Sequence, residues 1–135
     1  MGMQHTTEAR FGALTLLGYD LHRLGFASQP EARLRAGDVM HVNLYWRAET
    51  QPGGDWRLAL GLLDEEGQER AGIDAEPVGG YATSLWQPGD VWRGQFNLVI
   101  PGDAPAGRYR LRVQLLSPDG TPGDEFLSEP FEVEP

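Results

Sequence analysis

The sequence predicts an all-β domain, built as a two-sheet antiparallel β-sandwich of about seven or eight strands. Apolar and polar residues alternate in several short segments, which is the pattern of strands that bury one face in a core. The 18 glycines and 10 prolines of this 135-residue chain recur between those segments, where turns would join the strands. Long helices have little room in such a chain.

The clearest alternation lies between residues 39 and 47. One face of this segment carries Met40, Val42, Leu44 and Trp46, and the other carries His41, Asn43 and Tyr45. A period of two residues places successive side chains on opposite faces of a strand. The segment is therefore predicted to be a half-buried strand.

Further strands are predicted from the same period of two or from apolar runs at the two ends of the chain. They are expected at residues 11–17, 56–62, 92–100, 109–115 and 131–133, and the loop-rich segment 71–85 holds at most one short edge strand. Trp46, Leu60, Phe96 and Leu111 fall on the apolar faces of their strands. We expect these four side chains to lie in one common core.

Two connections have the composition of tight turns between antiparallel strands. Asp64 and Gly67 bound the first, Ser117 and Gly120 bound the second, and each turn separates two apolar runs. The stretch from Gly107 to Tyr109, placed just before an alternating segment, has the form of a tyrosine corner. Together with inward-facing tryptophans, these features favour an immunoglobulin- or fibronectin-like sandwich over an α/β fold.

The length of the chain fits one domain. Residues 10–135 are predicted to form a single β-sandwich domain, and residues 1–9 a disordered or artificial N-terminal extension. One short helical turn is expected at residues 30–33, where Pro30 could open it. The N-terminus lacks a basic stretch followed by an apolar core, so no signal peptide is predicted.

The charge balance restricts the possible partners. Eleven Lys and Arg residues against 20 Asp and Glu give a net charge of −9, which repels the phosphates of nucleic acids. No apolar run reaches the ~18 residues of a membrane span, so direct membrane insertion is not expected. The chain has no cysteine, which excludes disulfides and thiolate metal sites.

No group of residues has the spacing of a catalytic or metal site. His5, His22 and His41 lie on separate segments, without the spacing of paired metal ligands. The acidic residues at 64–66 and 119–125 do not follow the alternate spacing of a calcium loop. No serine has the context of a nucleophile elbow. We predict a protein that is not an enzyme, with no catalytic residue, no bound metal and no cofactor.

Aromatic residues allow two interpretations. Tyr45 points away from the core face of its strand, and Tyr81 and Trp86 fall in a loop-rich segment together with Asp74. Stacked on sugar rings, these side chains would form a carbohydrate-binding surface, with Asp74 or Asn43 accepting hydrogen bonds from hydroxyls. Alternatively, Trp86 is buried and closes one end of the sandwich. We prefer the second interpretation, because large aromatic residues more often lie in a core.

Several short motifs, in their order along the chain, resemble a bacterial β-sandwich module found as the extracytoplasmic C-terminal domain of large membrane proteins, including glycosyltransferase-like ones. The motifs are Leu17-Gly18-Tyr19-Asp20, Gly37-Asp38, Leu44-Tyr45-Trp46-Arg47-Ala48, Leu62-Leu63-Asp64 with Gly67, Asp74 with Pro77 and Gly80, Trp86-Gln87-Pro88-Gly89-Asp90 and Pro105-Ala106-Gly107-Arg108-Tyr109-Arg110-Leu111. The resemblance implies an immunoglobulin-like sandwich without an established activity, placed outside the cytoplasm or at the cell surface within a larger protein. The chain departs from the pattern at Gly61, where a histidine is often found, and at Ala82, where a proline is common.

These observations predict a non-catalytic accessory domain that mediates domain packing or protein interaction. Its expected partners are other domains or proteins. The alternative is a carbohydrate-binding module that uses exposed aromatics around Tyr45, Tyr81 and Trp86, with a glycan as the partner. The two hypotheses differ in whether these side chains are exposed.

Overall fold

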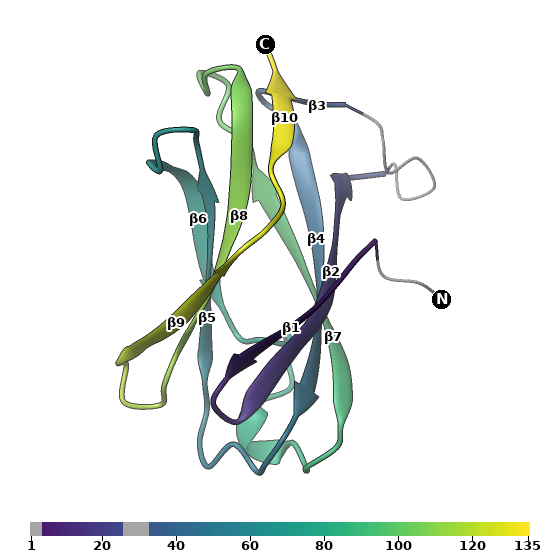
Figure 1. The fold of residues 1–135 in the computed structure, drawn as a ribbon, viewed down its shortest axis with the longest axis vertical. Helices are drawn as coiled ribbons and strands as arrows, with labels where there is room; N and C mark the ends of the chain where they lie inside the picture. The colour runs from purple at the N-terminus through teal and green to yellow at the C-terminus, as the bar shows by residue number, and fades with distance from the viewer. Residues whose placement is uncertain (1–3, 26–32) are drawn as a thin grey trace.

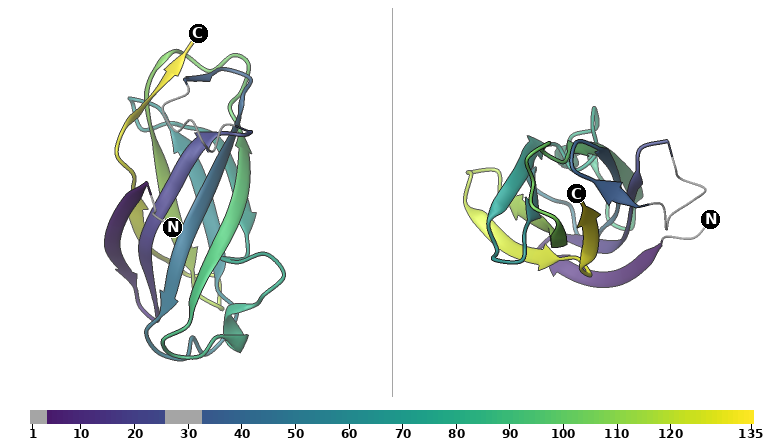
Figure 2. Two further views of the ribbon diagram at one scale, coloured as in Figure 1. Left: turned by 90° about the vertical axis from the view of Figure 1, so that its right-hand side faces the viewer. Right: turned by 90° about the horizontal axis from the view of Figure 1, so that it is seen from above.

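The computed structural model describes residues 4–25 and 33–135, which fold into a sandwich of two β-sheets (Figures 1 and 2). The first sheet has four antiparallel strands in the order β1-β2-β4-β7. Its strands are β1 (His5–Phe11), β2 (Leu14–Arg23), β4 (Val39–Ala48) and β7 (Val91–Val99). The predicted fold class is confirmed.

The second sheet has six strands. They are β3 (Leu34–Arg35), β10 (Phe131–Glu134), β8 (Gly107–Leu116), β5 (Arg57–Leu63), β6 (Glu69–Ala75) and β9 (Pro122–Leu127). The order is β3-β10-β8-β5-β6, and β9 pairs with β8 on the part of that strand that β10 leaves free. Among the strands of the described residues, only the short β10–β3 pair is parallel.

Two details of the prediction are wrong. The described residues form ten strands instead of seven or eight, because β3 and β9 carry no clear alternation and the segment predicted as one strand at residues 11–17 holds the end of β1, a turn and the start of β2. Residues 5–9, predicted to lie outside the domain, belong to β1 and pair with β2 from His5 onward. The helical turn expected at residues 30–33 lies almost wholly outside the described residues. Within them, the one helical segment is a short 3-10 turn, η1 (Thr83–Leu85), so no helix there is long and apolar enough to cross a membrane.

The core lies between the two sheets and contains the four predicted residues. Trp46, Leu60, Phe96 and Leu111 are all buried in one cluster. The tyrosine corner is also present, since the Tyr109 hydroxyl donates a hydrogen bond to the carbonyl of Pro105 over 2.6 Å. The period of two along β4, β7 and β8 therefore assigned the buried faces correctly.

A close backbone contact fixes the long connection between β6 and β7 to the inner face of β7. Gly94 is buried, and a Cβ atom added there would lie 2.1 Å from the carbonyl oxygen of Pro77. Only glycine allows the two backbones to approach so closely. The connection then turns through η1 to Trp86, which is packed into the core.

Candidate binding site

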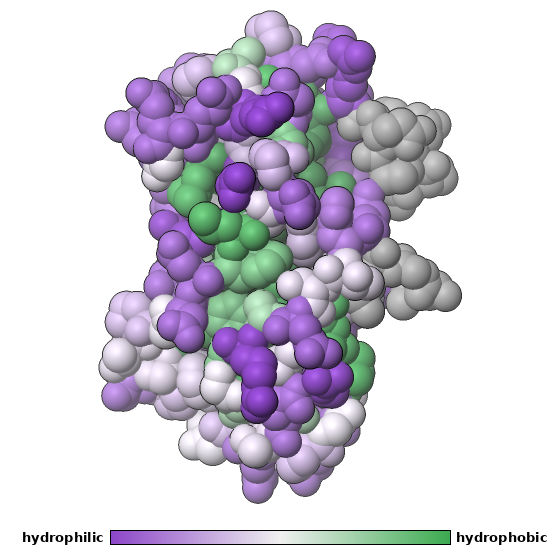
Figure 3. Space-filling model, viewed as in Figure 1, coloured by the Kyte–Doolittle hydropathy of each residue, from purple (hydrophilic) through white to green (hydrophobic). Residues whose placement is uncertain are grey.

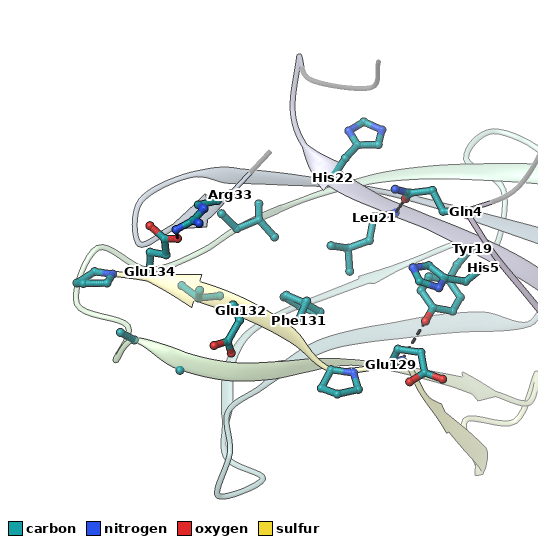
Figure 4. A pocket seen from close by; sticks show the side chains of 16 residues that line it. Gln4, His5, Tyr19, Leu21, His22, Arg33, Glu129, Phe131, Glu132 and Glu134 are labelled. Atoms are coloured by element: carbon teal, nitrogen blue, oxygen red, sulfur yellow. Dashed lines mark hydrogen bonds and ion pairs between the residues drawn. The ribbon is translucent and has the colours of Figure 1, made fainter. Parts of the chain in front are cut away.

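A cleft of about 810 Å³ opens on the side of the sandwich where β2 of one sheet faces β10 of the other (Figure 4). Its lining comes from five parts of the chain: residues 4–5, residues 19, 21 and 22 of β2, residues 33–34, residues 106–107 and the C-terminal stretch 129–135. The two sheets are not joined by hydrogen-bonded strands here. The sandwich is therefore open along this side.

The floor of the cleft is apolar. Leu21, Leu34 and Val133 are buried there, and Phe131 is partly buried against the same core. In the space-filling view an apolar band runs down the middle of this face between polar margins (Figure 3). An apolar floor with open access is the usual form of a surface that another molecule covers.

Tyr19 joins the two walls of the cleft. Its hydroxyl oxygen accepts a hydrogen bond from the backbone N–H of Glu129 over 2.9 Å, which connects β2 to the segment that leads into β10 (Figure 4). Burial, which disfavours the phenolate, raises the pKa of Tyr19. The exposed His5 ring stacks on Tyr19 with 4.6 Å between the ring centroids and 16° between their planes. This wall is thus held in a defined position.

Acidic side chains follow the β10 rim of the cleft. Glu129 and Glu132 are exposed, while Glu134 forms an ion pair with Arg33 over 2.5 Å across the upper end. The arginine side chain of that pair is largely exposed, so the pair contributes little stability. The rim therefore presents carboxylates above an apolar floor.

A hydrogen-bonded network lies outside the cleft, on the outer face of the first sheet, and is centred on Asp20. The Asp20 carboxylate accepts hydrogen bonds from the Gln4 N–H over 2.7 Å, the Asn43 amide over 3.0 Å and the Tyr45 hydroxyl over 2.6 Å. Burial opposes ionisation, but the hydrogen bonds from Tyr45, Gln4 and Asn43 outweigh it and hold the pKa of Asp20 below its usual value. The network continues to His41, whose Nε2 lies 3.0 Å from Oδ1 of Asn43.

The Asp20–Tyr45 hydrogen bond should make stability depend on pH. A carboxyl group whose pKa is lower in the folded chain stabilises the fold above the unfolded pKa, near 3.8, and loses this contribution as the pH falls through the folded pKa. Tyr45→Phe should therefore reduce the free energy of unfolding by about 1–3 kcal/mol at neutral pH, and by less in acid. Urea denaturation at several pH values measures this difference. Tyr81→Phe is the matched control, since that hydroxyl makes only a long hydrogen bond of 3.4 Å. A loss for Tyr45→Phe that stays constant down to acid pH would contradict the assignment.

The four residues predicted for a binding site do not come together. Tyr45 lies on the outer face of the first sheet, as expected, but its side chain is only 4% exposed. Trp86 is fully buried, whereas Tyr81 is partly buried and stacks obliquely on Trp92 with ring centroids 4.6 Å apart. Asp74 is exposed on β6, in the other sheet. The preferred interpretation, a buried Trp86, is confirmed, because this side chain is packed into the core. The alternative, an exposed aromatic surface around Tyr45, Tyr81 and Trp86, is wrong, because Trp86 is buried and Tyr45 is hydrogen-bonded against its own sheet.

The residues around the cleft were not predicted as a site. The sequence assigns Phe131 to the last strand and Tyr19 to one of the shared motifs, but it does not show that they face one cleft. Among the described residues, no group of three or more His, Asp or Glu side chains could hold a metal ion. The arrangement can bind a partner through apolar contact and peripheral charge.

Comparison with known proteins shows the fold. Neither a scan against protein-family models nor a search of curated proteins gives a match. Among solved structures, the C-terminal domain of Wzt matches with a TM-score of 0.70 and 16% identity, over 96% of this chain and 78% of that one. This match confirms, at the level of the fold, the resemblance to a C-terminal β-sandwich domain.

Two glycoside hydrolases contain a similar sandwich as one part of a much longer chain. A β-glucuronidase of glycoside hydrolase family 2 matches with a TM-score of 0.62 and 12% identity, over 86% of this chain and 11% of the enzyme. A family 123 glycoside hydrolase from Clostridium perfringens matches with a TM-score of 0.51 and 12% identity, over 91% of this chain and 27% of the enzyme. At these identities the shared feature is the fold, a two-sheet β-sandwich that recurs as a part of larger proteins.

Proposed function

We propose that the chain is a non-catalytic accessory β-sandwich domain of a larger extracytoplasmic protein, and that it packs against another domain or protein through the cleft between β2 and β10. The observation that carries this proposal is the apolar floor of the cleft. Leu21, Leu34 and Val133 are already buried there, and the half-buried Phe131 presents apolar surface that is still open to solvent. A partner that covers Phe131 gains the free energy of removing the exposed part of its ring from water.

The comparisons support the accessory role. The Wzt match is to a C-terminal domain, and the glycoside hydrolase matches cover only 11% and 27% of those enzymes. A domain of this kind serves the protein that contains it by positioning or binding, and not by catalysis. The extracytoplasmic location is part of the proposal and rests on the sequence resemblance.

Carbohydrate binding has less support. It required an exposed aromatic surface, but Tyr45 and Trp86 are buried, and the Tyr81 ring packs against the Trp92 ring. Sugar recognition usually needs a flat ring that is open to solvent. A glycan therefore remains as an outcome of the test and not as a second proposal.

Site-specific photo-crosslinking in the intact polypeptide of the native host tests the accessory role. A photoreactive phenylalanine derivative replaces Glu132, which is exposed on the rim of the cleft. The control position is Ser84, which is exposed in η1 at the other end of the sandwich (Figure 1). We expect Glu132 to crosslink to one defined domain or protein, and Ser84 not to do so. Equal crosslinking from both positions, or none from Glu132, would refute the proposal, and binding of the chain to a glycan array would favour the carbohydrate alternative.

A further inference from the structure

The outer strand of the first sheet, β7, has one unpaired edge. In the order β1-β2-β4-β7, the described residues provide β7 with a single partner, β4. The view onto this sheet in Figure 2 shows β7, in green, at its margin. The β4–β7 register runs from Val39–Val99 to Arg47–Val91 without a shift. The strand is therefore regular, and it contains neither a bulge nor a proline that would protect its edge.

Two hydrogen bonds at the ends of the β4–β7 pair show which backbone groups are free. The Ile100 N–H donates to the carbonyl of Asp38, and the Ala48 N–H donates to the carbonyl of Asp90, each over 2.9 Å. In an antiparallel ladder, alternate residues direct both of their backbone groups to the same neighbour. The even-numbered residues of β7 therefore face β4. The backbone groups directed to the free edge are those of Val91, Arg93, Gln95, Asn97 and Val99.

These backbone groups have no partner within the described part of the chain. None of its backbone or side-chain hydrogen bonds uses the N–H or C=O of the five residues. The edge thus offers a ladder of unused donors and acceptors along a nine-residue strand. A second strand could satisfy all of them.

Gln95 is the central one of these five residues, so a two-fold axis at Gln95 would pair each of them with a residue of the same set in the second copy. In an antiparallel pair related by a two-fold axis at Gln95, Val91 lies opposite Val99 of the second copy, and Arg93 lies opposite Asn97. Val91 and Val99 are 55% and 58% exposed, and such a pair would give each an apolar neighbour across the strands. Arg93 is the one charged residue of β7, and this register keeps it away from its own copy. Two copies of this edge can therefore pair without placing like charges opposite each other, and with apolar residues opposite apolar ones.

We propose that the chain forms a two-fold dimer in which β7 pairs antiparallel with β7 of a second copy about Gln95. The two four-stranded sheets then join into one continuous sheet. The interface is isologous, so each contact other than the one at the axis occurs twice. This edge lies on a different strand from those that line the cleft, and the dimer leaves the cleft accessible.

Sedimentation equilibrium of the 135-residue chain over about a hundredfold range of concentration tests the dimer. The Gln95 N–H faces the free edge, so Gln95→Pro removes a donor that the dimer uses in both copies while leaving the β4–β7 pairing intact. We expect Gln95→Pro to be monomeric with an unchanged circular dichroism spectrum. The matched control Gln95→Thr keeps the N–H and should dimerise like the wild type. A wild type that stays monomeric throughout, or a Gln95→Pro variant that dimerises normally, would overturn the proposal.

A pair of charge variants tests the register independently of the proline. Asn97→Arg places an arginine opposite Arg93 at two symmetrical positions, so the dimer dissociation constant should rise about tenfold. Asn97→Glu places a carboxylate opposite Arg93 and should lower the dimer dissociation constant by a similar factor. Both effects should be smaller at high salt. A dimer that responds to neither variant would show that copies associate in another register or at another surface, and would refute the pairing about Gln95.

Discussion

Replacing Trp86 with alanine should lower the free energy of unfolding by roughly 3–5 kcal/mol, because a fully buried indole leaves a large cavity behind. The side chain holds the connection between β6 and β7 in place. Its Nε1 donates a hydrogen bond to the carbonyl of Tyr81 over 3.3 Å, and its ring centroid lies 6.4 Å from that of Trp92. Chemical denaturation followed by circular dichroism measures the loss.

The neighbouring Leu85 supplies the matched control for Trp86. Its side chain is 58% exposed although it lies in the same connection, so Leu85→Ala should change the free energy of unfolding by less than about 0.5 kcal/mol. A Trp86→Ala variant that kept its melting temperature but lost retention on a glycan would contradict the burial and revive the carbohydrate hypothesis. The two residues thus separate an anchoring role from a binding role.

The sequence allows the inner and outer faces of a strand to be assigned where one face is buried, but not where both faces are buried. Along β7, every second residue from Gly94 to Leu98 is buried, and the residues between them are exposed. In β2, by contrast, Leu14, Thr15 and Leu16 are all buried, and the pairing with β4 shifts between Leu16 and Gly18. A period of two does not appear in such a segment, because polar and apolar faces are no longer distinct.

The exposure of Tyr45 could not be derived from its own strand. The period of two correctly places it opposite to Trp46, on the outer face of the sheet. Its burial depends on β2, where Gly18, which has no side chain, pairs with Tyr45, and where Asp20 accepts the hydrogen bond of its hydroxyl. Such contacts depend on how strands pair with one another, and the residue pattern of a single strand does not show that pairing.

The cleft could not be predicted for a related reason. Its walls are joined by contacts between residues far apart in the chain: Tyr19 and Glu129 are 110 positions apart, and Arg33 and Glu134 are 101 apart. The sequence assigned these residues to strands or loops, but their approach depends on how two sheets meet at an open side. Sequence patterns show which face of a strand is buried, whereas the cleft is formed where two different sheets meet.

Replacing Leu60 with alanine should cost roughly 2–5 kcal/mol, and the result tests the register of the second sheet. Leu60 lies in the middle of β5, where it pairs with Ile73 of β6 and with Val113 of β8, and its side chain is 1% exposed. Since a shift of one residue would turn the side chain to the outer face, the size of the loss reports whether this face points into the core. Leu127→Ala makes the same chemical change at a side chain that is 40% exposed on β9, and should cost much less. A loss below about 1 kcal/mol for Leu60→Ala in chemical denaturation, or equal losses for the two variants, would mean that β5 pairs in a different register.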